Sequence, residues 1–128
     1  MHTPEINLVL AWVGILLGFG SGFILGLSFQ KENWLGGYSS WKRRLYRLGH
    51  ISFFGLALMN LAFYFTVRNS PISTSVLVAS FGFALGAISM PICCVAMAHR
   101  PGWRAIFLIP VLSLLTAASF TLFEITKL

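Results

Sequence analysis

Side chains that can bind a metal ion or haem iron gather near two predicted helix ends: His50, Met90, Cys93, Cys94, Met97 and His99. Imidazole, thiolate and thioether groups together suit Cu(I) or haem iron. Met90, Cys94 and Met97 are spaced by four and then three residues, which would place them on one face of a helix. One interpretation is therefore a metal site formed by His50, Met90, Cys93, Cys94 and Met97.

A bis-histidine site for haem b, formed by His50 and His99, is a second interpretation of the same cluster. His99 precedes Arg100 at the very end of its predicted helix, which is a shallow position for a buried haem. Methionine and cysteine are also ordinary packing residues in apolar helices. No CxxC or HxxxH spacing is present in the sequence. Packing around an interfacial histidine is thus the alternative to a haem b or copper cofactor.

The elements that must position these residues are long apolar segments. The chain is 57% hydrophobic and only 9% charged, with a mean hydropathy of +0.83, whereas soluble domains contain about 25% charged residues. A membrane-spanning helix needs about 20 apolar residues, and segments of about that length occur at 6–29, 48–67, 73–98 and 104–125. We therefore expect residues 1–128 to form one all-α integral membrane domain, an antiparallel bundle of four transmembrane helices.

The basic residues predict the orientation of this bundle. All lysines and arginines except Arg68 and Lys127 lie in the first and third connections, and such clustering marks the cytoplasmic side. Both termini are then expected on the non-cytoplasmic side, in a bacterial inner membrane. Residues 40–48 are expected to form a short amphipathic segment in the membrane interface, before the second helix. Its cations would bind anionic lipid headgroups rather than nucleic acid: Lys42, Arg43, Arg44 and Arg47.

Small and polar residues mark the faces expected to pack. Gly14, Gly18, Gly22 and Gly26 recur every four residues, which predicts a close approach of another helix. Asn60 lies in an apolar run and must have a hydrogen-bond partner there. A seam of small residues from Ser75 to Ala96, which includes Gly82 and Gly86, has a spacing of 3.5 residues. We expect this seam to face the side of the second helix that carries His50 and Asn60.

The composition argues against an enzyme. Only three acidic residues are present, and the sequence contains no carboxylate pair, nucleophile elbow or phosphate-binding glycine loop. The first predicted helix also lacks a buried carboxylate that could couple transport to protons. We therefore expect a small non-catalytic membrane protein, an accessory or assembly subunit that contacts other membrane subunits or a second copy of itself. The alternative is a redox or metal-handling module that uses His50 and its neighbours.

Overall fold

The computed structural model describes residues 3–127, which are almost entirely helical. Within this range the elements are α1 (Thr3–Ser28), η1 (Trp34–Gly36), α2 (Trp41–Val67), α3 (Thr74–His99), η2 (Pro101–Phe107) and α4 (Leu108–Thr126). The elements η1 and η2 are short 3-10 helices. Each long helix, with η2 counted as part of α4, is long and apolar enough to cross a membrane. The prediction of an all-α fold with four membrane-spanning helices is confirmed.

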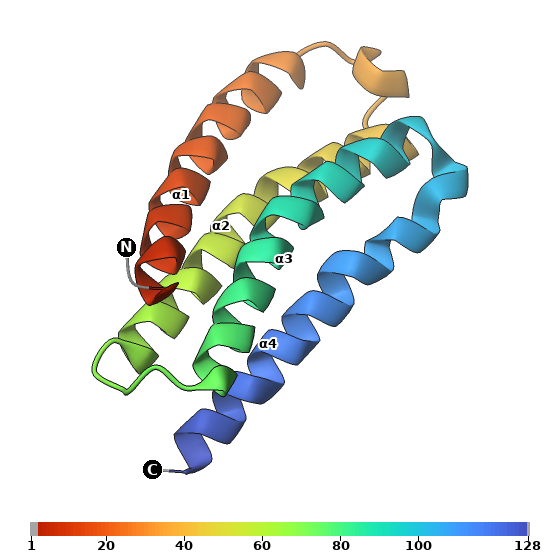
Figure 1. Ribbon diagram of the computed structural model, residues 1–128. Coiled ribbons are helices and arrows are strands. Elements are labelled where there is room, and N and C mark those ends of the chain that lie inside the picture. Colours follow the sequence, from red (N-terminus) through yellow and green to blue (C-terminus); the bar gives the residue numbers. More distant parts are fainter. Residues whose placement is uncertain (1–2, 128) are drawn as a thin grey trace.

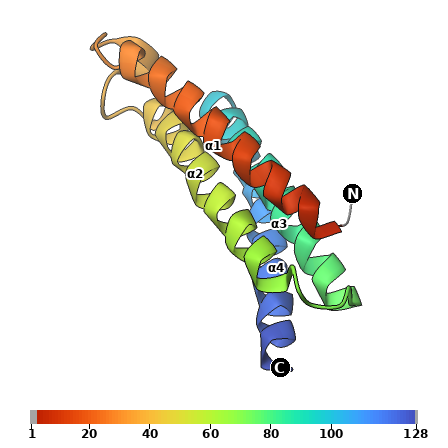
Figure 2. The same ribbon diagram turned by 90° about the vertical axis from the view of Figure 1, so that its left-hand side faces the viewer.

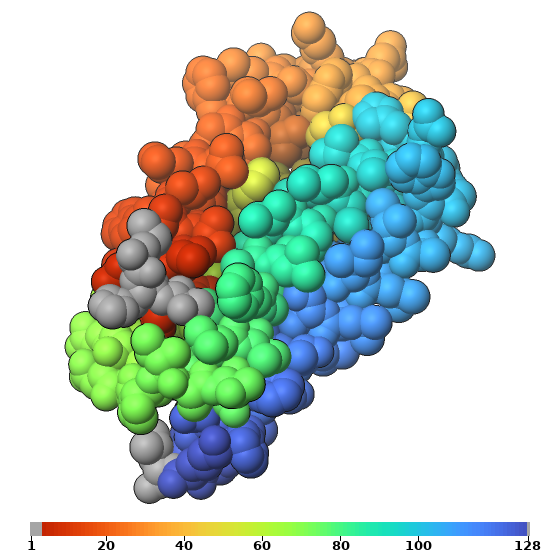
Figure 3. Space-filling model, in the orientation of Figure 1, coloured from red at the N-terminus to blue at the C-terminus, as the bar shows by residue number. Residues whose placement is uncertain are grey.

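The long helices form an antiparallel bundle in which α1 and α4 lie on opposite sides of α3 (Figure 1). Helix α2 packs against both α1 and α3, whereas α4 packs mainly against α3. A view turned by 90° places α1 and α2 side by side, with α4 on the far side of the bundle (Figure 2). In the space-filling view, part of α2 is visible at the bottom of a hollow between α1 and α3 (Figure 3).

Helix α2 begins earlier than the sequence suggested. Residues 41–47, expected as a separate interfacial segment, are the first turns of one continuous helix. Ser40 caps this helix, because its hydroxyl accepts a hydrogen bond from the Arg43 backbone N–H at 3.2 Å. The preceding loop reverses direction through Leu35, Gly36 and Gly37, whose φ angles are 53°, 85° and 100°. Two of these three left-handed positions are glycines, which adopt that conformation without steric cost.

The glycines of α1 let α2 approach closely. A Cβ atom added to Gly14 would lie 3.1 Å from the Cβ of Ala57, and one added to Gly18 would lie 2.7 Å from the ring of Phe54. Gly26 differs, since a Cβ atom there would meet nothing within 4 Å. The glycine row therefore serves packing inside the chain over most of its length, but not at its last position.

The small seam of α3 faces α4, not the helix expected from the sequence. A Cβ atom on Gly82 would lie 2.8 Å from the Cβ of Ala117 and 2.9 Å from the Ser113 carbonyl oxygen, both on α4. A Cβ atom on Gly86 would overlap the side chain of Leu114. The expected pairing of this seam with the His50 and Asn60 face of α2 is wrong. A spacing of 3.5 residues identifies a packing face but carries no information on which neighbour covers it.

Asn60 meets partners on two helices. Its Oδ1 accepts a hydrogen bond from Asn7 Nδ2 on α1 at 2.7 Å, and its Nδ2 donates to the Phe83 carbonyl on α3 at 3.3 Å. Asn7 in turn accepts from the Ser80 hydroxyl and donates to the Ser80 carbonyl at 3.2 Å. Asn7 and Asn60 are completely buried, and Ser80 is 2% exposed. This polar network ties α1, α2 and α3 together where water cannot compete for the hydrogen bonds.

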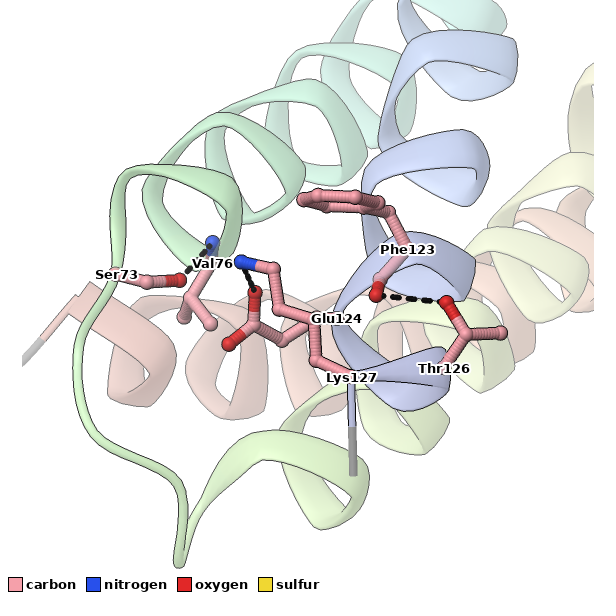
Figure 4. Close-up of polar contacts among 6 residues, drawn as sticks. All are labelled: Ser73, Val76, Phe123, Glu124, Thr126 and Lys127. Atoms are coloured by element: carbon pink, nitrogen blue, oxygen red, sulfur yellow. Dashed lines mark hydrogen bonds and ion pairs between the residues drawn. The ribbon is translucent and has the colours of Figure 1, made fainter.

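Local hydrogen bonds organise the end of the molecule that carries the α2–α3 turn (Figure 4). Ser73 caps α3 by accepting from the Val76 backbone N–H at 3.2 Å. In the last turn of α4, Lys127 Nζ lies 3.2 Å from Glu124 Oε2, an ion pair at i,i+3. Glu124 therefore has a cationic partner at the end of its helix.

Candidate functional site

His50 lies on the side of α2 that faces α1, where glycine leaves room for its ring. A Cβ atom added to Gly22 would come within 2.8 Å of His50 Cε1, so the imidazole fills the space that Gly22 leaves open. His50 Nδ1 lies 2.8 Å from the Ser21 hydroxyl oxygen, and the ring meets Phe54 edge-on at 5.6 Å between centroids. Within residues 3–127, Nε2 has no hydrogen-bond partner. One nitrogen of a positioned imidazole is thus free to bind another group.

His50 lines a cavity of about 230 Å³ between α1, α2 and α3. Three aromatic residues, Trp34, Tyr46 and Phe53, line it together with the imidazole. A second cavity of about 300 Å³ lies next to it, and the two share Phe53 and Pro91. The walls of the second cavity are aliphatic apart from Phe53, with Leu10, Leu17 and Ile88 among them. We call the two cavities together the α1–α3 cleft, which corresponds to the hollow in Figure 3.

The predicted sulfur ligands point to different neighbours. Cys93 Sγ lies 3.5 Å from the Ile106 carbonyl oxygen on η2. The Cys94 side chain packs against Gly49 on α2, and Met97 packs in a cluster with Leu45 and Ala98. Met90 is half-buried on α3. In the part of the chain that the structure describes, no three histidine, cysteine, aspartate or glutamate residues are close enough to hold a metal ion.

His99 belongs to a different surface from His50. Its Nε2 lies 2.7 Å from the Tyr46 hydroxyl, and it lines a separate shallow cavity at the end of α3. Tyr46 is the link between the two, because its side chain also lines the cavity of His50. The structure therefore pairs each of the two imidazoles with its own hydroxyl partner and places them in different cavities.

Arg43 departs from its expected position among the lipid headgroups. Its side chain is only 1% exposed, and its guanidinium donates to the Phe29 carbonyl at 2.9 Å and to the Glu32 carbonyl at 3.5 Å. The guanidinium carbon lies 4.7 Å from the centre of the Phe29 ring and 5.6 Å from that of Tyr38. These contacts satisfy carbonyl groups that follow α1 and hold the 29–38 loop over the start of α2. Arginine suits this role because its planar cation can bind carbonyls and stack on rings together.

The other three cations of this segment are more accessible. Lys42 and Arg44 are exposed, while Arg47 is half-buried and lies 5.0 Å from the ring of Tyr38. Contact of these cations with anionic headgroups therefore stays a prediction, and the exposed side chains of Lys42 and Arg44 are the ones accessible for it.

Sequence reasoning missed several residues of the site. Ser21 and Tyr46 carry the hydroxyl partners of the two histidines, and Asn7 completes the network of Asn60. A polar residue inside an apolar segment was the available signal for Asn7, as it was for Asn60. Ser21 gave only a weak signal, because serine often bonds to its own helix, as Ser21 also does at the Gly18 carbonyl.

Comparison with protein-family models, curated proteins and solved structures finds no match to this chain.

Proposed function

We propose that this chain is a small non-catalytic membrane protein that acts as an accessory or assembly subunit of a larger membrane complex. The observation that supports the proposal is the one-sided packing of α4, whose main contact is α3. The opposite face of α4 is open along its length: Leu112, Leu115 and Leu122 are 57%, 60% and 62% exposed. A helix from a partner subunit could extend the bundle on this face.

The remaining helices make a firm support for such a contact. The buried network of Asn7, Asn60 and Ser80 ties α1, α2 and α3 together, and α4 packs against α3 of this set. Preorganisation of this kind lowers the entropy cost of association. In this proposal the protein resides in a bacterial inner membrane with both termini on the non-cytoplasmic side. Lys42 and Arg44 then contact anionic headgroups on the cytoplasmic face.

Site-specific photo-crosslinking in the native membrane tests the subunit proposal. A benzophenone amino acid at Leu115, on the open face of α4, is expected to give a crosslink to another protein. The matched control is the same group at Leu16, which is 69% exposed on α1 and is expected to crosslink to lipid alone. Crosslinks to lipid at both positions, with the chain migrating alone on a native gel, would contradict the proposal. A crosslink to a second copy only would replace it with a homo-oligomer.

A second candidate function is a haem b or copper module centred on His50. The specific observation in its favour is that His50 lines the cavity and that, within residues 3–127, its Nε2 has no hydrogen-bond partner. An absorption spectrum of protein purified in mild detergent, recorded oxidised and after dithionite reduction, tests for haem, and metal analysis tests for copper. A Soret band or stoichiometric copper that is lost in His50→Ala would support this candidate. A featureless spectrum without bound copper would exclude it.

A further inference from the structure

The α1–α3 cleft has two ends of different chemistry. At one end, the aromatic residues Trp34, Tyr46 and Phe53 line the same cavity as the His50 imidazole. At the other end, the walls are aliphatic side chains of α1, α2 and α3. Flat rings pack well against aromatic walls, and a hydrocarbon chain packs well in an aliphatic channel, which has no polar groups. The cleft thus offers a place for a ring with polar groups that is attached to a long apolar tail.

The Ser21–His50 pair allows His50 Nε2 either to donate or to accept a hydrogen bond. The Ser21 hydroxyl has two acceptors within reach, the Gly18 carbonyl at 3.2 Å and His50 Nδ1 at 2.8 Å. When Ser21 donates to Gly18, His50 Nδ1 carries the proton and Nε2 accepts. When Ser21 donates to Nδ1, the proton is on Nε2, which then donates. The same nitrogen can therefore bind a carbonyl oxygen or a hydroxyl group.

The cleft is open sideways, toward the bilayer. Val95 and Ile24 line the aromatic end and are 43% and 62% exposed, and Ile88 and Ile92 line the aliphatic end and are 53% and 61% exposed. These side chains form the outer rims of the cleft on helices that span the membrane. A ligand dissolved in the membrane can therefore reach the cleft without passing through water.

We propose that the α1–α3 cleft binds a prenylated quinone, with its ring against the aromatic walls, one oxygen on His50 Nε2 and its tail along the aliphatic end. Among residues 3–127, no lysine or arginine lines either cavity, and both terminal nitrogens of the nearby Arg43 donate to carbonyls, those of Phe29 and Glu32. A phospholipid phosphate would need such a cation, whereas the neutral oxygens of a quinone need a hydrogen bond. This proposal is independent of the accessory-subunit proposal.

Quenching of tryptophan fluorescence by decylubiquinone tests the site on the whole protein in detergent. Trp34 lines the cavity, so saturable quenching is expected, and Trp34→Phe should remove most of it. His50→Ala is expected to weaken binding about tenfold, as for the loss of a hydrogen bond in a secluded site. Val95→Phe should narrow the opening and also weaken binding, while it changes only a partly exposed side chain. Its matched control, Leu112→Phe on the open face of α4, should bind like the unchanged protein.

The alternatives give different results in the same assay. If n-decanol, which has a tail but no ring, displaces decylubiquinone at equal concentration, the cleft is a general acyl-chain site and the quinone proposal fails. Non-saturable quenching would also overturn it. Equal affinity in the unchanged protein, His50→Ala and Val95→Phe would place any bound quinone elsewhere. Circular dichroism and thermal unfolding of each variant separate lost binding from lost folding.

Discussion

Asn60 shows how one buried polar residue can join three helices. The amide sits among apolar side chains, yet both its oxygen and its nitrogen find partners, on α1, α3 and its own helix at the Leu56 carbonyl. Leaving a buried polar group without a partner costs more than a made hydrogen bond contributes. The requirement for a partner could therefore be predicted from Asn60 alone. That the partner is Asn7 could not be predicted, because it depends on the relative position of α1 and α2 along their axes.

Replacing Asn60 with alanine should destabilise the bundle. The change removes the shorter of the two hydrogen bonds that the buried Asn7 amide donates and leaves it only the Ser80 carbonyl, so the free energy of unfolding should fall by about 1–2 kcal/mol. Unfolding by SDS titration, followed by circular dichroism, measures this loss. Ser119→Ala is the control, since Ser119 is exposed and its hydroxyl donates to the Leu115 carbonyl of its own helix. The Asn7→Ala, Asn60→Ala double variant should lose less than the sum of the single changes, and strict additivity would contradict the network.

At the scale of elements, the sequence predicted the helices better than their contacts. Apolar runs without charge located the spanning segments, although α2 begins at Trp41, before the expected start of the second span at residue 48. The seam that contains Gly82 and Gly86 was recognised as a packing face but assigned to α2, whereas it meets α4. Two helices that each carry a small-residue face can pair in several ways, and the choice depends on the shapes of bulky neighbours such as Leu114. Spacing along one helix does not contain that information.

Gly82→Ala should separate α3 from α4. The new methyl group would lie 2.8 Å from the Ala117 Cβ and 2.9 Å from the Ser113 carbonyl oxygen, so the helices must move apart. The Ser113 hydroxyl would then also lose its 2.7 Å bond to the Gly82 carbonyl. Overpacking of this kind costs about 1–3 kcal/mol, which thermal unfolding in detergent can measure.

The matched control for this change is Gly26→Ala. A methyl group at Gly26 meets nothing within 4 Å, so this variant should be at least as stable as the unchanged protein. If Gly82→Ala were equally harmless, the close contact of α3 with α4 would be wrong.

Along the bundle, hydrogen bonds join α1, α2 and α3 at one level, and a cavity lies between these helices at another level. The hydrogen bonds of Asn7, Asn60 and Ser80 fix α1, α2 and α3 at one level. At the level of His50, the same three helices leave an open cavity between them. The sequence identified His50 as a candidate ligand for a metal ion or haem iron. It could not reveal the cavity, because Ser21, Trp34 and Phe53 come together only when three helices and a loop are assembled.

We expect the orientation of the molecule in the membrane to depend on the different charges of its two ends. The end with the 29–40 loop and η2 carries Lys42, Arg44 and Arg100 as exposed cations, and moving such charges through the translocation machinery is unfavourable. That end should therefore remain cytoplasmic. The opposite end carries the α2–α3 turn with Asn69, together with the end of α4.

Cysteine labelling measures this orientation directly. A membrane-impermeant maleimide added to intact spheroplasts should label Asn69→Cys, and should label Gly102→Cys only after the membrane is opened. Both positions are exposed, whereas the native Cys93 and Cys94 are 4% and 0% exposed, so the unchanged chain provides a low background. The reverse pattern would place the basic end outside. Replacing Lys42 and Arg44 with glutamine should give a mixed pattern, because fewer exposed cations would then oppose translocation of this end.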